Sequence, residues 1–239
     1  DRLWASMTPE QRDQSETHCI RGKSYTLMTE KPGLLPGLLP RILSQVLRAR
    51  SAVKKAMKAV KDPFELALLN GKQLALKVSA NSIYGFTGVK AGYLPCKPLA
   101  AIVTSVGRQM IEDTRDAVYA RYPGSSVIYG DTDSVMVIFG GVTPDEAGVQ
   151  KSFDLGDEAA EWISTHTFPS PYVELEMEKV YWPYILYKKK RYAGLMFTHR
   201  QDPGAVDTKG LENVRRDNCA LLRDTLNTVQ EHVLHRRLP

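Results

Sequence analysis

Apolar residues recur at helical spacing in the first half of the chain. Between residues 41 and 61 they return every three or four positions, which predicts a helix with one apolar stripe. The stripe consists of Ile42, Val46, Ala49, Val53, Ala56 and Val60. Asp62-Pro63 then supplies an N-cap and a first-turn proline, and Glu65 completes a capping-box pattern, so a second helix should run from Pro63 to about Tyr84. Because almost no residues join the two helices, we expect an antiparallel helical hairpin.

Three more stretches are predicted to be helices. Residues 99–122 and 144–167 have apolar residues at helical spacing, and a last helix is expected after residue 219. The first has Ile102, Val106, Met110 and Val118 as core candidates. The apolar residues of the second are Phe153, Leu155, Ala159, Trp162 and Ile163, and those of the third are Leu221, Leu222, Leu226, Val229 and Val233. Residues 86–97 have the glycines and prolines of a loop. Residues 1–30 are polar and irregular, and they predict no element.

The second half of the chain contains runs typical of strands. Residues 127–129 and 135–139 are rich in β-branched residues and flank a short polar centre, which predicts a hairpin whose apolar strands are buried. Residues 173–178 alternate strictly between apolar and acidic residues, which predicts a strand with one apolar face. Residues 181–187 and 191–197 predict two further strands of an antiparallel sheet. The expected fold class is therefore α+β, with an antiparallel sheet and an acidic β-hairpin packed on helices, plus the two-helix hairpin.

Composition narrows the class of protein. The chain has 239 residues, of which 43% are hydrophobic and 25% charged, as in an ordinary soluble globular protein of one or two domains. A net charge of +5 permits a nucleic-acid partner. The three cysteines, Cys19, Cys96 and Cys219, lie far apart and predict neither a zinc site nor a disulfide framework. No apolar run approaches membrane-spanning length, so we expect no membrane partner.

The polar centre of the predicted hairpin carries two carboxylates. Gly130-Asp131-Thr132-Asp133 has the residues of a tight turn, so Asp131 and Asp133 should lie at its tip. Carboxylates held close together repel each other and attract a hard divalent cation such as Mg²⁺, which takes its other ligands from water and substrate phosphate. The alternative is an Asp-rich turn that only caps a hairpin. Since a buried hairpin does not need two acids at its tip, the pattern favours the metal site.

Two polar patterns indicate a phosphate or nucleic-acid ligand. The second helix carries a polar stripe that interrupts apolar residues, and those apolar residues otherwise suggest that the helix is buried. Within the stripe, Lys77 and Asn81 lie one turn apart, so their side chains can hold phosphate oxygens together. The stripe consists of Asn70, Gln73, Lys77, Asn81 and Tyr84, and the interrupted residues are Leu74, Ala75, Leu76, Val78 and Ala80. Residues 188–192 join four cations to an aromatic ring, which suits a nucleic-acid backbone. The alternatives are a solvated helix face and a basic surface turn.

Four short motifs resemble those of family B DNA polymerases, in unbroken order over residues 33–239. They are Y-G-D-T-D-S at Tyr129–Ser134, K-x-x-x-N-S-x-Y-G at Lys77–Gly85, R-x-x-x-K at Arg50 and Lys54, and K-K-R-Y at Lys189–Tyr192. The residues that follow, at 193–194, 209–212 and 214–219, look like the delta-type members of the family and their viral relatives. Motifs in the right order across most of a chain are far more specific than any one of them.

The resemblance implies a domain organisation. Residues 33–85 would be the fingers, residues 86–208 the palm with its catalytic hairpin, and residues 209–239 the start of the thumb. Residues 1–32 would be an N-terminal segment linked to the palm. The implied reaction is template-directed DNA synthesis, in which a nucleotide is transferred from dNTP to a primer 3′-hydroxyl with the help of two Mg²⁺ ions.

The resemblance also implies roles for individual residues. Asp131 and Asp133 would be the catalytic, metal-binding carboxylates, with Asp133 as the principal ligand. Nucleotide binding would fall to Arg50, Lys54, Lys77, Asn81 and Tyr84, the last of these against the nascent base pair. Primer–template DNA would be held by Tyr129, Lys189, Lys190, Arg191 and Tyr192. Accessory subunits and a sliding clamp would bind through regions outside these residues, in the nucleus or, for a viral enzyme, at a viral replication site.

The sequence departs from the family pattern in two places. It contains no D-x-x-S-L-Y-P motif, which carries another metal-binding aspartate, and no exonuclease motif, so we expect a fragment of a polymerase that is inactive alone. Residues 33–40 repeat the tetrapeptide G-L-L-P, which leaves the start of the first fingers helix open. Two alternatives are a non-catalytic DNA-binding scaffold relative and another two-metal enzyme with an acidic hairpin. The four intact polar residues Asp131, Asp133, Lys77 and Asn81 argue against the first, and the fingers motif argues against the second.

Overall fold

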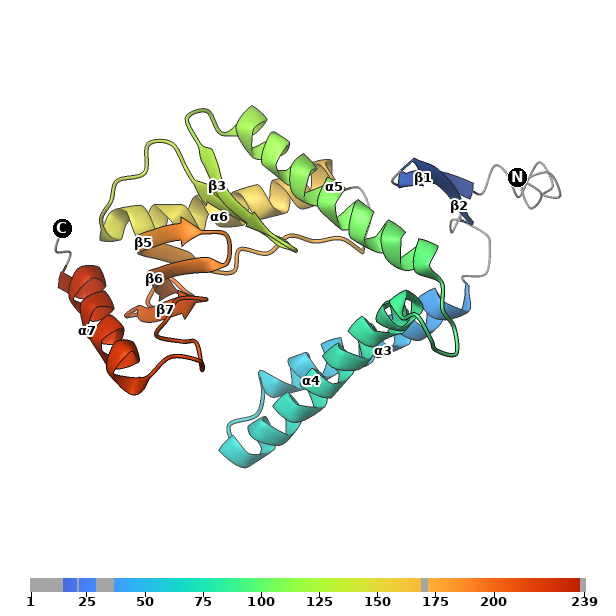
Figure 1. Ribbon diagram of the computed structural model, residues 1–239, viewed down its shortest axis with the longest axis horizontal. Helices are drawn as coiled ribbons and strands as arrows, with labels where there is room; N and C mark the ends of the chain where they lie inside the picture. The colour runs from blue at the N-terminus through green and yellow to red at the C-terminus, as the bar shows by residue number, and fades with distance from the viewer. Residues whose placement is uncertain (1–14, 21, 29–36, 169–171, 237–239) are drawn as a thin grey trace. The chain divides into compact units, whose positions relative to one another are not determined.

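A computed structural model describes residues 15–20, 22–28, 37–168 and 172–236 of the chain (Figure 1). The chain divides into two compact units, Asp1–Val106 and Gly107–Pro239, which we describe separately. Helices are mixed with small antiparallel sheets, so the predicted α+β class is confirmed. The fingers, palm and thumb boundaries stay predictions. Among the described residues, no helix combines the length and the apolar character needed to span a bilayer.

The first described element of the first unit is a hairpin that the sequence pattern missed. Strands β1 (Ser15–Ile20) and β2 (Lys23–Met28) pair in antiparallel register, with Gly22 in the turn at a φ of 74°. Short polar strands of this kind have no clear apolar alternation, so periodicity alone does not reveal them. The first copy of the G-L-L-P repeat, at residues 33–36, lies outside the described residues.

The two helices predicted at residues 41–61 and 63–84 are present and form an antiparallel hairpin (Figure 1). Helix α3 (Leu38–Met57) starts three residues before the predicted range and ends four residues before its end, and α4 (Pro63–Gly85) starts at the predicted proline. The Asp62 carboxylate caps α4 by accepting the Glu65 amide at 2.9 Å. Of the residues expected to be apolar core, only Val53 and Ala80 are buried, whereas Leu74 and Val78 are 53% and 59% exposed. The burial that the apolar residues of α4 suggested is therefore wrong for most of this helix.

A one-turn helix, η1 (Phe86–Gly88), follows α4, and a loop leads to helix α5 (Lys97–Arg121). Helix α5 spans the boundary between the units, and its predicted range of 99–122 is confirmed within two residues. Ile102 and Val118 are buried as predicted. The buried Thr114 hydroxyl donates to the Met110 carbonyl at 2.7 Å, so this polar group is satisfied within the helix.

The described residues of the second unit form two sheets and two helices besides the end of α5. Strands β3 (Ser126–Asp131) and β4 (Ser134–Ile138) form the predicted acidic hairpin. Strands β5 (Val180–Lys188), β6 (Arg191–Phe197) and β7 (Ala205–Lys209) form an antiparallel sheet in that order. Helix α6 (Glu146–His166) confirms the predicted helix, and α7 (Ala220–Arg236) follows the last strand. Strand β7 was not predicted.

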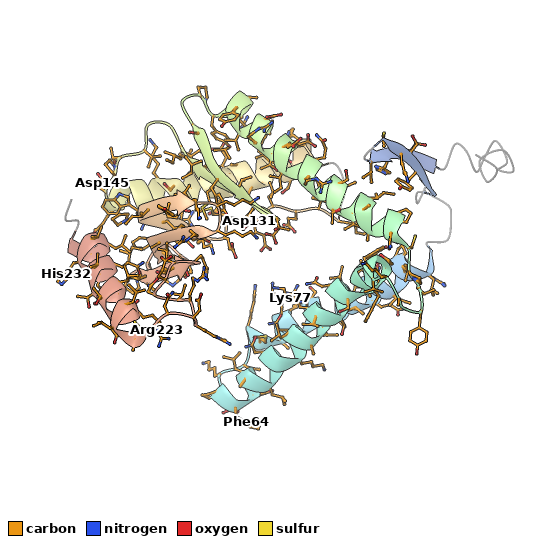
Figure 2. All side chains as sticks on the ribbon, in the orientation of Figure 1. Phe64, Lys77, Asp131, Asp145, Arg223 and His232 are labelled. Atoms are coloured by element: carbon orange, nitrogen blue, oxygen red, sulfur yellow. The ribbon has the colours of Figure 1, made fainter. Side chains whose placement is uncertain are left out.

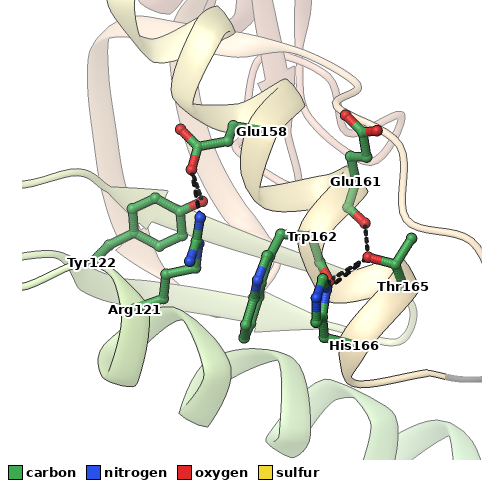
Figure 3. Close-up of polar contacts among 7 residues, drawn as sticks. All are labelled: Arg121, Tyr122, Glu158, Glu161, Trp162, Thr165 and His166. Atoms are coloured by element: carbon green, nitrogen blue, oxygen red, sulfur yellow. Dashed lines mark hydrogen bonds and ion pairs between the residues drawn. The ribbon is translucent and has the colours of Figure 1, made fainter.

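The end of α5 is fastened to α6 just before the acidic hairpin begins (Figure 3). The Arg121 guanidinium forms an ion pair with Glu158 at 3.1 Å and lies 4.7 Å from the centre of the Trp162 ring. The Tyr122 hydroxyl donates to the same Glu158 carboxylate at 3.3 Å. Beneath them, Val118 and Ile163 form a buried cluster against which Val127 and Val137 of the hairpin pack.

Two predictions about the second unit are wrong. Residues 173–178 keep the predicted alternation of burial, but they are not a strand. Val173 and Leu175 pack on the α6 side of the core and the Leu175 amide donates to the Ser164 side chain at 2.8 Å, so helix contacts replace strand pairing. The hairpin strands are only partly buried, since Ile138 is 56% exposed. In α7, for which the sequence pattern specified no buried face, Leu234 is buried and Leu221 is 78% exposed.

Candidate functional site

The acidic hairpin closes with the geometry that the sequence predicts. Asp131 pairs with Ser134 across the end of the ladder, so Thr132 and Asp133 form a two-residue turn. Figure 2 shows Asp131 on this hairpin in the second unit. The register shifts between Val127 and Tyr129, where an irregularity interrupts the ladder. The structure therefore brings Asp131 and Asp133 together at one hairpin tip.

Both oxygens of the Asp131 carboxylate are engaged within the second unit. Oδ2 accepts the Tyr129 hydroxyl at 3.0 Å. Oδ1 accepts the Thr132 amide at 2.9 Å and lies 3.2 Å from Nζ of Lys190. The Thr132 amide is the main cause that lowers the pKa of Asp131 to about 2, and Lys190 and Tyr129 lower it further. Asp131 is therefore ionised throughout the neutral range and already has a positively charged partner.

Asp133 has the opposite environment. Its side chain is exposed, and among the described residues it makes no hydrogen bond and no ion pair. A free carboxylate at a turn is a ready oxygen ligand for a hard cation. The two aspartates are thus chemically unequal, because a cation bound to Asp131 would have to compete with Lys190.

The basic turn, which we define as Lys189-Lys190, joins β5 to β6 and lies against the hairpin. Lys190 adopts a left-handed backbone with φ of 62°. Its amide donates to the Tyr129 hydroxyl at 3.0 Å, while its ammonium reaches Asp131. The Tyr129 hydroxyl therefore connects the backbone of the basic turn to the Asp131 carboxylate. Burial is the main cause that raises the pKa of Tyr129, so this hydroxyl keeps its proton and can donate it.

Four tyrosines pack together beneath the basic turn. The ring centres of Tyr129 and Tyr192 are 6.0 Å apart, and those of Tyr184 and Tyr192 are 5.5 Å apart. Tyr181 completes the cluster, with its ring centre 6.0 Å from that of Tyr192 and its hydroxyl donating to Asp207 at 2.6 Å. Tyr192 is buried, so its ring supports the turn from inside.

Asp207 secures the base of this cluster. Burial opposes ionisation of Asp207, but hydrogen bonds from Tyr181 and Lys209 outweigh it and lower the pKa of the carboxyl group. The Lys209 ammonium lies 2.9 Å from Asp207. Tyr181 is consequently held by a carboxylate acceptor, and burial together with that carboxylate raises the pKa of Tyr181.

The predicted DNA-binding residues differ in what they can still reach. Lys188 and Lys189 are exposed, and within the described part of the chain neither pairs with a carboxylate. Arg191 instead forms an ion pair with Glu212, and its guanidinium lies 5.3 Å from the centre of the Tyr187 ring. Arg191 and Tyr192 are therefore engaged inside the second unit, as is Lys190 through Asp131, while Lys188 and Lys189 remain available to a ligand.

The predicted nucleotide-binding residues lie in the first unit, on the helical hairpin. Nε of Arg50 donates to Oε1 of Gln73 at 3.3 Å, which ties α3 to α4 one turn before Lys77. Lys54, Lys77 and Asn81 are exposed and make no hydrogen bond or ion pair among the described residues. Figure 2 shows Lys77 on α4. The hairpin thus presents cations and an amide along one pair of helices, as expected for a phosphate ligand.

Asn81 also lines a shallow pocket of about 390 Å³ in the first unit. The pocket is mostly apolar, and its other lining residues are Val78, Ser82, Gly85, Phe86 and Val89. Tyr84 lies on the same turn of α4, and its carbonyl accepts the Thr87 hydroxyl at 2.6 Å. Such an apolar pocket beside the polar stripe of α4 can bind a ligand that carries a flat ring next to a charged group.

The donor set of the hairpin fits a divalent cation only in part. Across the described ranges, no group of three or more His, Cys, Asp or Glu side chains could hold a metal ion. Asp133 offers an unpaired carboxylate, whereas Asp131 offers one that Lys190 already neutralises. Mg²⁺ is commonly held by one or two protein carboxylates, with its other ligands coming from substrate phosphates and water. The two carboxylates of this hairpin therefore fit a Mg²⁺ ion that takes its other ligands from the substrate and water.

Sequence reasoning did not identify the residues that support the basic turn. These are Asp207, Gly210 and Glu212. Two features of the sequence could have identified two of them. Gly210 directly follows a strand, and Glu212 is an acid that can pair with Arg191 next to the turn.

Comparisons with known proteins agree on one family. The profile described as DNA polymerase family B matches residues 5–238. DNA polymerase delta catalytic subunits are 50% identical over 193 residues in Glycine max and 48% identical over 226 residues in Bos taurus. These matches cover 78% and 91% of this chain but only 17% and 19% of the two relatives, so the chain spans under a fifth of their length.

A solved structure supports the same grouping. The family B DNA polymerase from the archaeon Pyrobaculum calidifontis matches with a TM-score of 0.52 and 26% sequence identity, over 86% of this chain and 26% of that chain. The family that the four motifs predicted is confirmed by the profile match and by the identity to the delta catalytic subunits. This chain belongs to DNA polymerase family B.

Proposed function

We propose that these residues form part of a DNA-directed DNA polymerase of delta type, which transfers a nucleotide from dNTP to a primer 3′-hydroxyl. The observation that carries the proposal is the acidic hairpin, where the unpaired Asp133 lies beside an Asp131 that is tied to the basic turn. The identity of about half the residues to delta catalytic subunits supports the same activity.

The residues of the hairpin divide the work of the site. Asp133, as the free carboxylate, is the principal ligand for a divalent cation, and Asp131 contributes only when Lys190 moves away. Two Mg²⁺ ions, when bound, would supply Lewis-acid activation of the primer hydroxyl and neutralise the departing pyrophosphate. Thr132 and Tyr129 hold Asp131 in place, so the tip of the hairpin is ordered before substrate arrives.

The two groups of basic residues handle different parts of the substrate. Lys189 and Lys190 hold the primer–template backbone, with Tyr129, Arg191 and Tyr192 forming the ordered support of their turn. Arg50, Lys54, Lys77 and Asn81 hold the triphosphate, and Tyr84 lies against the nascent base pair. Because Lys54, Lys77 and Asn81 have no partner among the described residues, they are free to bind phosphate oxygens when substrate arrives.

The proposal includes the wider context of the enzyme. Residues 1–239 alone should not extend a primer, because the hairpin supplies only two carboxylates and no third metal ligand joins them among the described residues. The active polypeptide would work in the nucleus with accessory subunits and a sliding clamp, since the delta catalytic subunits it resembles come from eukaryotes. Imaging of a fluorescent fusion would test the location.

Asp133→Asn tests the central assignment. In a polymerase polypeptide that contains these residues, the substitution should reduce primer extension by at least about 10³-fold while primer–template affinity changes less than about twofold. Asp224→Asn, which alters an exposed carboxylate on α7, is the matched control and should extend primers at the wild-type rate. Near-normal extension by Asp133→Asn would refute the metal role.

The scaffold alternative makes a different prediction. A DNA-binding relative without chemistry would bind primer–template normally in wild-type form and show no extension at any Mg²⁺ concentration. The unpaired state of both Asp133 and Lys77 favours the enzyme, because a scaffold gains nothing from leaving them exposed.

A further inference from the structure

The segment that follows β7 packs directly against the basic turn. Lys209, the last residue of β7, pairs with Tyr192 of β6, so the ends of these strands lie beside the turn. Gly210 comes next, with φ of 64°. A Cβ atom added at Gly210 would overlap the carbonyl oxygen of Lys190. The absence of a side chain at Gly210 is therefore what lets the Lys190 backbone take its place.

Glu212 holds the same turn through a second contact. Its carboxylate pairs with the Arg191 guanidinium, and this pairing lowers the pKa of Glu212. The side chains are 21% exposed for Arg191 and 39% exposed for Glu212, so the pair is better shielded than most surface ion pairs. Arg191 directly follows Lys190, and fixing its side chain fixes one end of the turn.

The segment is itself anchored to α7. The Asn218 side chain donates to the Glu212 carbonyl at 3.0 Å. The buried Asn213 side chain donates to Asn227 and to Gln230 on α7, each at 2.8 Å. Gly210 and Glu212 are therefore rigidly placed, and they can act as a support for the turn.

The opposite side of the turn is in contact with the acidic hairpin. Two contacts set its position there, from the Lys190 amide to Tyr129 at 3.0 Å and from the Lys190 ammonium to Asp131 at 3.2 Å. Hydrogen bonds weaken steeply when they lengthen or bend, so a shift of the Lys190 backbone by about 1 Å would break the first contact and misplace the second.

We propose that Gly210 and Glu212 are positioning residues, which hold the basic turn against the acidic hairpin and so align the DNA-holding lysines with Asp131. The inference rests on the proposed function, because its consequence is a change in primer–template binding. Neither residue touches the reacting atoms, and both act through Lys190 and Arg191.

The first test is Gly210→Ala with Gly141→Ala as its control. Gly141 also has a left-handed backbone, with φ of 71°, but a Cβ atom added there meets nothing within 4 Å. Both alanine variants therefore suffer the same kind of backbone strain, and only Gly210→Ala adds a clash. Fluorescence anisotropy would measure primer–template affinity at several salt concentrations without Mg²⁺. Gly210→Ala should weaken binding roughly tenfold and reduce the salt slope by about 0.9, the value of one phosphate contact. Gly141→Ala should change neither.

A double-mutant cycle separates positioning from general damage. If Gly210 acts through the turn, adding Lys190→Ala to Gly210→Ala should cost less than about twofold more affinity, although Lys190→Ala alone weakens binding severalfold. Additive losses in the double variant would overturn the inference, because they would show that Gly210→Ala acts elsewhere.

Glu212→Gln keeps the test decisive if Gly210→Ala does not fold. Its control is Asp217→Asn, which weakens the exposed pair of Arg215 and Asp217 in the same segment. Glu212→Gln should weaken primer–template binding roughly threefold to tenfold and Asp217→Asn less than twofold. Equal effects of the two would overturn the inference. A wild-type protein that does not bind primer–template would instead refute the proposed function.

Discussion

Leu234 in α7 offers a sharp test of how this fold is held together. Its side chain is 1% exposed, and α7 lies against β5 and β6 of the sheet. Leu234→Ala removes three carbon atoms, which are worth about 2.4 kcal/mol at about 0.8 kcal/mol per methylene group. Incomplete collapse of the remaining cavity adds to this loss and brings the expected destabilisation to about 3–4 kcal/mol.

Leu221→Ala is the matched control, because it makes the same chemical change on the same helix. Leu221 is 78% exposed, so only about a fifth of its side chain leaves water on folding. The same calculation gives a loss of roughly 0.5 kcal/mol. The two variants therefore differ by about 3 kcal/mol for burial alone, with residue type and element held constant.

Urea unfolding of the wild type and the two variants would measure the difference. The slope of unfolding free energy against urea should be unchanged, so that the midpoint reports stability directly. Hydrogen exchange of the α7 amides would show whether the helix detaches from the sheet before the rest unfolds. Equal losses in the two variants, or a loss below about 1 kcal/mol in Leu234→Ala, would refute the burial argument.

Two other predictions concern the site. Lys77→Ala should raise the KM for dNTP roughly tenfold or more by removing a phosphate contact, with primer–template affinity unchanged, whereas Lys72→Ala, on another face of α4, should leave steady-state kinetics unaltered. The pKa of Asp131 lies at about 2, below its ordinary value of 3.8, so its ionised form stabilises the hairpin above pH 3.8 and this contribution is lost as the pH falls towards 2. Carboxyl NMR should show Asp131 still ionised at pH 3, and a midpoint near 3.8 would contradict the contacts.

Much of the fold could be predicted from local pattern. Asp62-Pro63 marks the start of α4 because an N-cap acceptor and a first-turn proline act within one helical turn. The acidic hairpin follows from β-branched runs around a Gly-Asp turn, which again involves neighbours in sequence. Such features are decided by residues a few positions apart, and the sequence contains all of them.

Some elements could not be predicted in this way, because their state depends on distant partners. Residues 173–178 alternate like a strand, but Val173 and Leu175 pack against the cluster of Val118 and Ile163, and the Leu175 amide donates to the Ser164 side chain of α6. The helix after residue 219 was predicted, but its buried position, Leu234, depends on where the sheet meets α7. The periodicity of apolar residues predicts that a helix forms, but tertiary packing determines which of its apolar residues are buried.

The candidate site, like the fold, has features that follow from the sequence and features that depend on tertiary contacts. The sequence alone determined the family, since its motifs stand in an order specific to that family, and from the family it predicted roles for Asp131, Asp133, Lys77 and Lys190. Only the tertiary structure decided how they are paired: Asp131 is neutralised by Lys190, and Asp133 has no partner within the described ranges. The reason is physical. Asp131 and Lys190 are 59 positions apart in the sequence, and an ion pair between them exists only when folding brings their side chains within a few ångströms.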